Sequence, residues 1–265
     1  MKLTILGSGT YQPELDRHSS SYLVETDDGQ KICFDFGRGA VDQLLKIGVH
    51  INQLDAFFIS HWHPDHVSDL LPLLHITIAA PGDLATDWIP RKKPLKLYGP
   101  QGTIEKLDLL RKATFLDYFK MEGNIEVREI ADDSIDSQDW QVKSFKTVHI
   151  PPRIKIDTPA LCYRMESNDK VFAYSGDTIE SEGLARAIKD ADLAIIEASW
   201  PEKVKPGSHM TGQRAGKVAE KNGVKKLVLT HMSPLYLKDF DPKKDAKKYF
   251  KGEVILAKDL LEFEL

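Results

Sequence analysis

Three histidines and one aspartate lie within six positions of the chain, in the segment DAFFISHWHPDHVSDL at residues 55–70. These residues are His61, His63, Asp65 and His66. Imidazole nitrogens and carboxylate oxygens together suit zinc, iron or manganese, and the residue types alone do not rank these metals. Four such groups in six positions indicate a metal site rather than a scattered set of surface side chains.

The local elements explain how these four groups could face one another. The apolar run 56–60 predicts a buried strand. If the backbone stays extended beyond it, His61 and His63 point to the same side, because side chains alternate along a strand. Asp65 is placed to cap a helix that we predict over residues 67–74. A strand end followed by a helix start would therefore direct all four side chains into one small volume.

One segment rarely supplies every ligand of a metal, so we expect further donors in other segments. The candidates are His149 after the run 141–148, Asp177 in AYSGDT, His209 in GSHMTGQRAG and His231 in THMSPLY. Each of these residues alone is weak evidence for a metal site. A lone histidine at a strand end is more often a structural residue, and an aspartate in a Gly-Asp-Thr turn usually serves the turn itself. Together with the HxHxDH segment, they predict a shared centre built from five segments.

Two residues near these candidates have more limited predictions. Thr211 is placed to cap the helix predicted at 211–221. Glu197 ends the apolar run LAIIEAS, and two interpretations of it stay open. It either hydrogen-bonds His209 or a ligand histidine from behind, or it is a solvated strand end.

The remaining pattern predicts the elements that must position these side chains. Strands are predicted at 3–6, 22–25, 31–35, 56–60, 95–98, 126–130, 141–148, 160–165, 171–174, 193–198, 226–230 and 253–256. Helices are predicted at 40–47, 67–74, 104–112, 183–189 and 211–221. Strand clusters with interspersed helices favour two packed sheets covered by helices on the outside. No shift in composition marks a boundary, so we expect one domain over 1–265, with a lid-like loop at 80–94.

Composition excludes several classes of protein. The 265 residues are 42% hydrophobic and 29% charged, which is typical of a folded globular chain. A net charge of −4 provides no overall basic field for nucleic acid. The two cysteines, Cys33 and Cys162, have no CxxC spacing, which argues against a thiolate zinc site. No run approaches the ~20 apolar residues of a membrane helix, so we expect a cytoplasmic protein without a membrane partner.

The ordered motifs resemble a known family. HxHxDH, the isolated His149, SGDT and THMSP occur in the order found in metallo-β-lactamase-fold hydrolases. Within that superfamily the chain is most similar to the ribonuclease Z group, through ILGSGT at 5–10, PLKLYGPQG at 94–102 and the segment 209–234. The resemblance implies an αββα sandwich of mixed α/β class, with a two-metal centre at one edge of the sheets.

The resemblance also implies a role for each candidate. His61, His63 and His149 would hold the first ion, Asp65, His66 and His231 the second, and Asp177 would bridge both. The two divalent ions would be zinc, with manganese or iron as alternatives, and they would activate a water. Asp65 would orient that water, and His209 would contact the scissile phosphate or protonate the leaving oxygen.

Two departures bear on the substrate. The ribonuclease Z group carries a flexible RNA-binding arm between the positions of His149 and Asp177, which are here only 28 positions apart (177 − 149). The group's tRNA-processing members favour Arg where this chain has Leu235. We therefore expect a phosphodiesterase acting on a small, cyclic or nucleotide-like phosphodiester. The alternatives are tRNA 3′-end processing, lactone or ester hydrolysis, and a non-hydrolytic metal or redox role. Relatives of this build often pair, so a homodimer is compatible with the sequence, but no sequence feature sets the oligomeric state.

Overall fold

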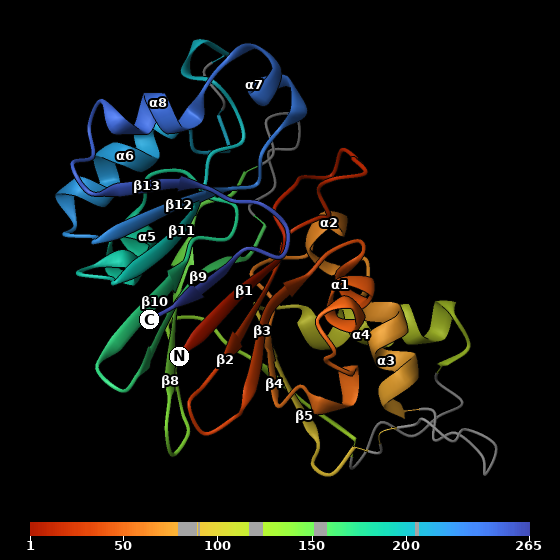
Figure 1. Cartoon of the computed structure of the whole chain (residues 1–265). Helices are drawn as coiled ribbons and strands as arrows, with labels where there is room; N and C mark the ends of the chain where they lie inside the picture. The colour runs from red at the N-terminus through yellow and green to blue at the C-terminus, as the bar shows by residue number, and fades with distance from the viewer. Residues whose placement is uncertain (79–88, 90, 117–123, 151–157, 205–206) are drawn as a thin grey trace.

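The structure is a computed structural model that describes residues 1–78, 89, 91–116, 124–150, 158–204 and 207–265 (Figure 1). Its strands form two mixed sheets of seven strands each. The first sheet has the order β14-β1-β2-β3-β4-β5-β6 and contains β1 (Lys2–Gly7), β2 (Ser21–Glu25), β3 (Lys31–Phe36), β4 (Ala56–Phe58), β5 (Leu95–Gly99), β6 (Ile125–Glu129) and β14 (Glu262–Glu264). The second has the order β13-β12-β11-β10-β9-β8-β7 and contains β7 (Ser134–Asp136), β8 (Gln141–Thr147), β9 (Ala160–Ser167), β10 (Lys170–Tyr174), β11 (Leu193–Glu197), β12 (Lys226–Thr230) and β13 (Glu253–Leu256).

The main core lies between the two sheets and is rich in aromatic rings. Phe34 of β3 stacks on Phe58 of β4, with ring centroids 5.3 Å apart, and meets Tyr163 of β9 at 5.5 Å. These side chains are fully buried. Burial of each large apolar side chain contributes roughly 1.5–3 kcal/mol. The alternation predicted for these strands therefore supplies an inner face that joins the sheets.

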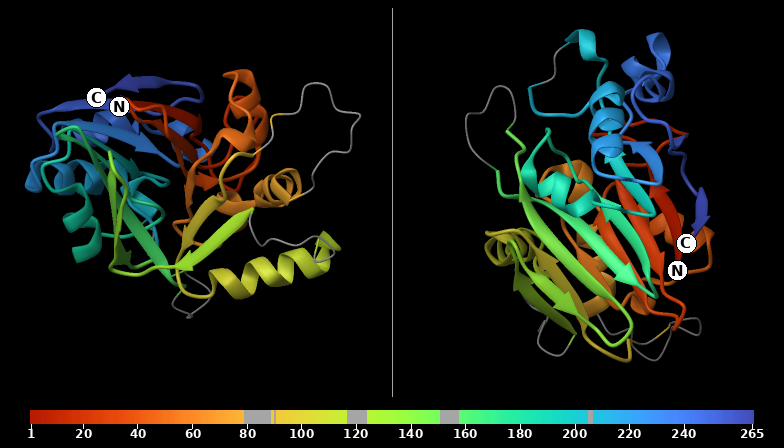
Figure 2. Two further views of the ribbon diagram at one scale, coloured as in Figure 1. Left: turned by 90° about the horizontal axis from the view of Figure 1, so that it is seen from below. Right: turned by 90° about the vertical axis from the view of Figure 1, so that its left-hand side faces the viewer.

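The helices cover the outer faces of the two sheets, as the views in Figure 2 show. The helices α1 (Ala40–Lys46), α2 (Pro64–Val67), α3 (Leu70–Ile78) and α4 (Thr103–Ala113) lie with the first sheet. The helices α5 (Glu182–Ile188), α6 (Gly212–Lys221), α7 (Pro234–Asp239) and α8 (Pro242–Lys247) lie with the second. Short 3₁₀ turns occupy η1 (Ile51–Gln53) and η3 (Glu202–Val204). The predicted αββα sandwich is confirmed. Within the described residues, no helix has the length and hydropathy needed to span a membrane.

Some local predictions are wrong. The single helix predicted at 67–74 is two helices, α2 and α3, separated at Ser68 and Asp69. Asp69 interrupts the helix because its N–H donates to the Phe36 carbonyl (3.0 Å) and its carboxylate accepts from the Val41 N–H (3.1 Å). Asp65 therefore lies inside α2 and does not cap a later helix. In contrast, Thr211 caps α6 as predicted, accepting from the Arg214 N–H. The short strands β7 and β14 and the helices α7 and α8 were not predicted.

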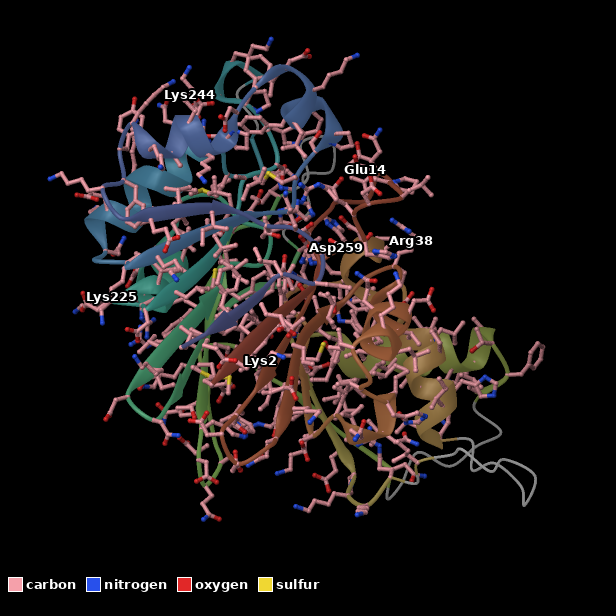
Figure 3. All side chains as sticks on the ribbon, viewed as in Figure 1. Lys2, Glu14, Arg38, Lys225, Lys244 and Asp259 are labelled. Atoms are coloured by element: carbon pink, nitrogen blue, oxygen red, sulfur yellow. The ribbon has the colours of Figure 1, made fainter. Side chains whose placement is uncertain are left out.

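The C-terminal strand β14 forms one edge of the first sheet, where it pairs with the N-terminal strand β1. Asp259, labelled in Figure 3, lies in the turn before β14 and joins this segment to the N-terminal loop. It accepts hydrogen bonds from Ser8, through both N–H (3.0 Å) and hydroxyl (2.8 Å), and its Oδ2 lies 2.7 Å from His18 Nδ1. The first and last segments of the chain thus form one connected network.

Strand direction determines where the candidate site lies. In the first sheet β3, β4 and β5 are parallel, and in the second β10, β11, β12 and β13 are parallel. The carboxyl ends of parallel strands meet at one edge of a sheet. β8 also runs toward this edge in the second sheet, because it is antiparallel to β9, which is antiparallel to β10. The loops after these strands therefore gather at one end of the sandwich.

Candidate metal centre

All seven predicted ligands meet at this edge, in overlapping clusters of donor atoms. In each cluster, one donor atom per residue lies within 4.8 Å of the others. The clusters are His61, His63, His149 and Asp177; Asp65, His66 and His231; and Asp177, His209 and His231. All except His63 and His209 are buried. The structure thus brings together residues from five separate segments, as predicted from their positions at strand ends.

Asp177 lies between the first two clusters, with one oxygen facing each. Its Oδ2 lies 3.8 Å from His61 Nε2 and 3.9 Å from His149 Nε2. Its Oδ1 lies 3.3 Å from His66 Nε2 and 3.4 Å from His231 Nε2. Gly176, with φ of +56°, turns the chain sharply just before it. A Cβ at Gly176 would lie 2.9 Å from the Leu161 carbonyl oxygen, so this close approach requires glycine.

The donor atoms fit divalent ions. His61 Nε2 and Asp177 Oδ1 are buried and have no hydrogen-bond partner among the described residues. His149 Nε2 and His63 Nδ1 face each other at 3.1 Å, and His231 Nε2 lies 3.2 Å from Asp65 Oδ2. Unsatisfied buried polar atoms are costly, and convergent imidazole and carboxylate donors are typical of divalent metal sites. The residues present therefore suit the metal ions that the resemblance implies.

Each buried histidine is oriented by a partner at its other ring nitrogen. The pairs are His61 Nδ1 with Ser60 Oγ (3.0 Å), His66 Nδ1 with Asp35 Oδ2 (2.7 Å), His149 Nδ1 with the Ser208 carbonyl oxygen (3.0 Å), and His231 Nδ1 with Ser199 Oγ (2.6 Å). Such partners fix the orientation of a ligand ring and direct its free nitrogen toward a metal.

Asp35 is the most connected of these partners, and it was not predicted from the sequence. Its carboxylate also accepts hydrogen bonds from the Ser60 N–H (2.7 Å), the Ser60 hydroxyl (2.6 Å) and the Tyr174 hydroxyl (2.6 Å). It is fully buried, and its φ of +55° lies in the left-handed region. A charged residue inside the apolar run ICFDF was the available signal, because a buried carboxylate needs partners.

The electrostatics of the centre favour cations. Although burial alone would raise the pKa of Asp65, His66 and His231 lower it to about 2. The pKa of Asp177 is likewise held well below its usual range, where His231 and His66 outweigh burial. Burial lowers the pKa of His61, His63 and His149, which leaves these rings neutral near pH 7. Ionised carboxylates beside neutral imidazoles form a ligand set ready for a divalent ion.

His66 differs from the other histidines. Burial would lower its pKa, but the carboxylates of Asp177, Asp35 and Asp65 raise it well above the usual value. A proton on this ring therefore offsets the negative charge that surrounds it. A divalent ion beside its Nε2 would take over that role and displace the proton.

His209 and Glu197 form a pair at the rim. His209 Nδ1 lies 3.0 Å from Glu197 Oε1 and 3.7 Å from Asp177 Oδ2. Glu197 is buried, and it also accepts from the Thr178 N–H (2.9 Å) and the Ser199 hydroxyl (2.7 Å), so the solvated interpretation of Glu197 is wrong. Burial would lower the pKa of His209, but Glu197 and Asp177 raise it to about 9. His209 therefore carries a proton near neutral pH.

Most of the lid-like loop predicted at 80–94 lies outside the described residues. Within the described part, Arg91 does not face the centre. Its guanidinium donates to the carbonyls of Leu54 (2.7 Å) and Ile51 (3.0 Å), and burial lowers its pKa to about 10. Arg91 is thus held by backbone carbonyls in η1 and just before β4.

Comparison with known proteins agrees with this geometry. The sequence model of the beta-lactamase superfamily domain matches residues 30–232. A protein named ribonuclease Z from Methanosarcina acetivorans is 28% identical, with 100% of this chain and 98% of that protein covered. The ribonuclease Z of Archaeoglobus fulgidus is 26% identical, with 100% and 97% covered. The alignment with each relative is longer than this chain, so each relative has residues without a counterpart here.

Solved structures show the same fold. Human tRNase Z, short form, is 25% identical with a TM-score of 0.75, and 100% of this chain and 99% of that chain are covered. The metallo-beta-lactamase fold protein YhfI from Bacillus subtilis is 24% identical with a TM-score of 0.80, and 99% of each chain is covered. These comparisons confirm the predicted superfamily, its likeness to ribonuclease Z and the expectation of a metal-dependent hydrolase.

Proposed function

Because the chain belongs to the beta-lactamase superfamily, we propose that it hydrolyses a small phosphodiester, linear or cyclic, with two divalent metal ions. The position of Asp177 carries this proposal, because its two oxygens face two separate clusters of donors. We assign His61, His63 and His149 to one ion and Asp65, His66 and His231 to the other, with Asp177 shared. We favour zinc, since five imidazoles and two carboxylates suit a borderline-soft ion.

Different residues of the chain would act on the attacking water and on the leaving oxygen. Two bound divalent ions would lower the pKa of a water and offset the negative charge that develops on the phosphate. The pKa of Asp65 is about 2, so its carboxylate is ionised near neutral pH. It would accept a hydrogen bond from that water and orient it. His209, which holds a proton through Glu197, would donate that proton to the leaving oxygen.

The preference for a small substrate rests on chain length and charge. The interval between His149 and Asp177 spans 28 positions (177 − 149), which leaves little chain for an RNA-binding arm. The net charge is −4, and Arg91, one of the basic residues of the loop at 80–94, is held by carbonyl oxygens. Both features weaken the affinity expected for a large polyanion.

A second candidate function is 3′-end processing of tRNA. It is favoured by relatives over the whole chain that are named ribonuclease Z, and by the likeness to human tRNase Z. Both candidates use the same centre on a phosphodiester, so they differ only in what binds beside it. In either case we propose a cytoplasmic enzyme.

The test begins with metal analysis of the purified protein, followed by reloading with zinc or manganese. Activity is then measured on bis(p-nitrophenyl) phosphate, cyclic nucleotides, a precursor tRNA and a lactone. Hydrolysis of the small diesters with slow cleavage of the precursor tRNA is the expected result. Efficient and site-specific cleavage of the precursor tRNA would favour the second candidate, and hydrolysis of the lactone alone would overturn both.

A further inference from the structure

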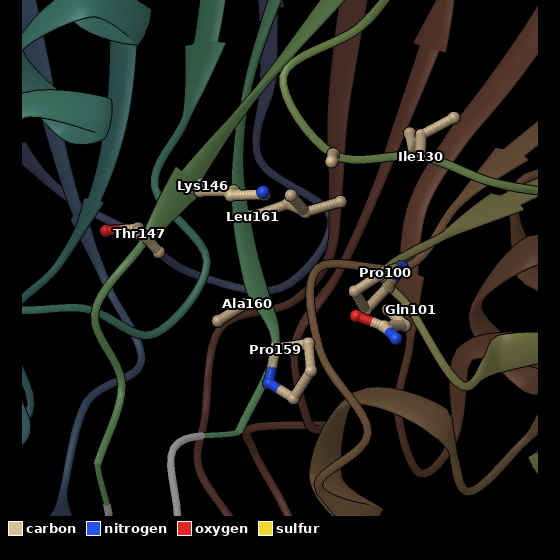
Figure 4. Close-up of a pocket in the computed structure, with 9 residues that line it drawn as sticks. Pro100, Gln101, Ile130, Lys146, Thr147, Pro159, Ala160 and Leu161 are labelled. Carbon is tan, nitrogen blue, oxygen red and sulfur yellow. The ribbon is translucent and has the colours of Figure 1, made fainter.

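A pocket of about 300 Å³ opens between the two sheets, beside the metal centre. One side is formed by Pro100 and Gln101, which follow β5, together with Ile130 after β6. The other side is formed by Lys146 near the end of β8 and Leu161 in β9 (Figure 4). The pocket therefore lies at the same end of the sandwich as the loops that carry the proposed ligands, and β8, which carries Lys146, leads directly to His149.

Hydrogen bonds tie the pocket wall directly to the metal centre. The Leu161 N–H donates to the Ser60 carbonyl (2.9 Å), and Ser60 immediately precedes His61. The Thr158 hydroxyl donates to the His149 carbonyl (2.6 Å), and Thr158 immediately precedes Pro159 in the pocket wall. Two proposed ligands of the same ion are thus attached to the wall. A group held in the pocket would be adjacent to a phosphate held at that ion.

The wall combines apolar surfaces with one cation at the rim. Pro100, Ile130 and Leu161 are buried and present apolar atoms to the space. Lys146 is exposed, and its ammonium forms no ion pair within the described part of the chain. Asp132, which accepts the Lys146 backbone N–H (3.2 Å), pairs instead with Arg186 at 3.7 Å. Among the described residues, therefore, no carboxylate engages the ammonium.

We propose that this pocket binds the nucleoside next to the scissile phosphate, so that the substrate is a nucleotide phosphodiester. This inference rests on the proposed function and narrows its substrate class. The volume lies at the lower end of ligand pockets, which suits one nucleoside and not a folded polymer. Apolar walls accept the face of a base, and the Gln101 amide and the Lys146 ammonium at the rim can hydrogen-bond acceptor atoms at its edge.

The test compares two chromogenic substrates, thymidine 5′-phosphate p-nitrophenyl ester and bis(p-nitrophenyl) phosphate. We expect Lys146→Met to lower kcat/KM for the nucleotide ester roughly tenfold more than for the simple diester, since a hydrogen bond to a charged group is lost. Lys143→Met is the matched control. Lys143 lies on the same strand and pairs with Glu166 (3.6 Å) outside the pocket, so this variant should keep the wild-type ratio.

A direct binding measurement separates this inference from the proposed function. Calorimetric titration with uridine and adenosine monophosphates should show binding that Lys146→Glu abolishes and Lys143→Glu preserves. If Lys146→Met keeps the wild-type ratio and Lys146→Glu binds nucleotides normally, the pocket assignment is wrong while the phosphodiesterase stands. If no phosphodiester is hydrolysed, the proposed function fails, and the titration alone then decides whether the pocket binds nucleotides. If a glycerol phosphodiester were hydrolysed with the same kcat/KM as the thymidine ester, the pocket assignment would also be wrong.

Discussion

Asp177 is the residue on which the two clusters of donors depend. Its carboxylate is only 3% exposed and lies within 4 Å of histidines from both clusters. Around it, the rings of His66 and His231 are held from behind by Asp35 and Ser199. A carboxylate in this position has no role in the apolar core of either sheet. Apart from His209 at 3.7 Å, the histidines within 4 Å of it are all proposed metal ligands.

Replacing Asp177 with Ala should remove the shared ligand and release at least one ion. We expect metal content after dialysis to fall to one ion or fewer per chain, and kcat to fall by a factor of about a thousand or more, because the water would lose its activation. Atomic emission analysis and steady-state kinetics measure both quantities. Full metal content with surviving activity would show that Asp177 is not the bridge.

His209 should behave differently, because we assign it to the leaving group and not to an ion. His209→Ala should keep both ions and lower kcat by about 10²–10⁴, the usual range for loss of a general acid. Glu197→Gln should lower kcat less, since it acts through His209, and the double variant should be no worse than His209→Ala. Loss of metal in His209→Ala would instead make His209 a ligand, as one of the donor clusters allows.

At the scale of elements, the turn after β12 depends on a segment at the opposite end of the sequence. His231 has a φ of +56°, an uncommon conformation for a residue other than glycine. The next residue, Met232, donates its N–H to the Ser8 carbonyl (3.1 Å), and Ser8 is held by Asp259. Asp259 in the C-terminal turn therefore holds Ser8 in the N-terminal loop, and Ser8 holds the residue next to the proposed ligand His231.

Asp259→Ala should weaken this support and lower the affinity for one of the two ions. Several buried donors would lose their acceptor, and we expect the free energy of unfolding to fall by about 2–4 kcal/mol. The ion assigned to Asp65, His66 and His231 should be lost first in a chelator titration. Asp259→Asn, which keeps an acceptor oxygen, should recover much of the affinity. Equal loss of both ions in Asp259→Ala would contradict this local effect.

At the scale of the whole molecule, the two sheets are joined by their aromatic core and also by the centre itself. In the proposed assignment, the first ion takes His61 and His63 after β4 of the first sheet and His149 after β8 of the second. A ligand that binds only the folded state stabilises that state in proportion to the logarithm of its concentration. Metal ions at this edge should therefore hold the sandwich together.

Removing metal should lower the stability of the protein. We expect Tm to fall on treatment with a chelator and to return with zinc, with a gain of about 2.7 kcal/mol when free zinc is a hundred times its Kd. Differential scanning calorimetry at several zinc concentrations measures this dependence. The Asp177→Ala variant is the control, since most of its zinc-dependent gain should be absent. A Tm independent of zinc in the wild type would argue against sites shared between the sheets.

The sequence predicted the sheets well because their signal is local. Alternation or a short apolar run is enough to identify a strand, and the twelve predicted strands all occur, with each end within two residues of its predicted position. Three-residue strands such as β7 and β14 carry too short a pattern to be seen. The break between α2 and α3 was missed because it depends on Asp69 bonding to β3 and α1, which are distant contacts.

The ligand residues of the proposed centre could be predicted from the sequence for a related reason. HxHxDH, His149, Asp177 and His231 stand at strand ends, where sequence position alone implies a shared edge. Only the tertiary structure revealed Asp35, Ser199 and Ser208 behind the rings, the division of the Asp177 oxygens between two clusters, and the pocket beside Lys146. These features arise from contacts between residues far apart in the chain, and the geometry of such contacts is decided when the two sheets pack.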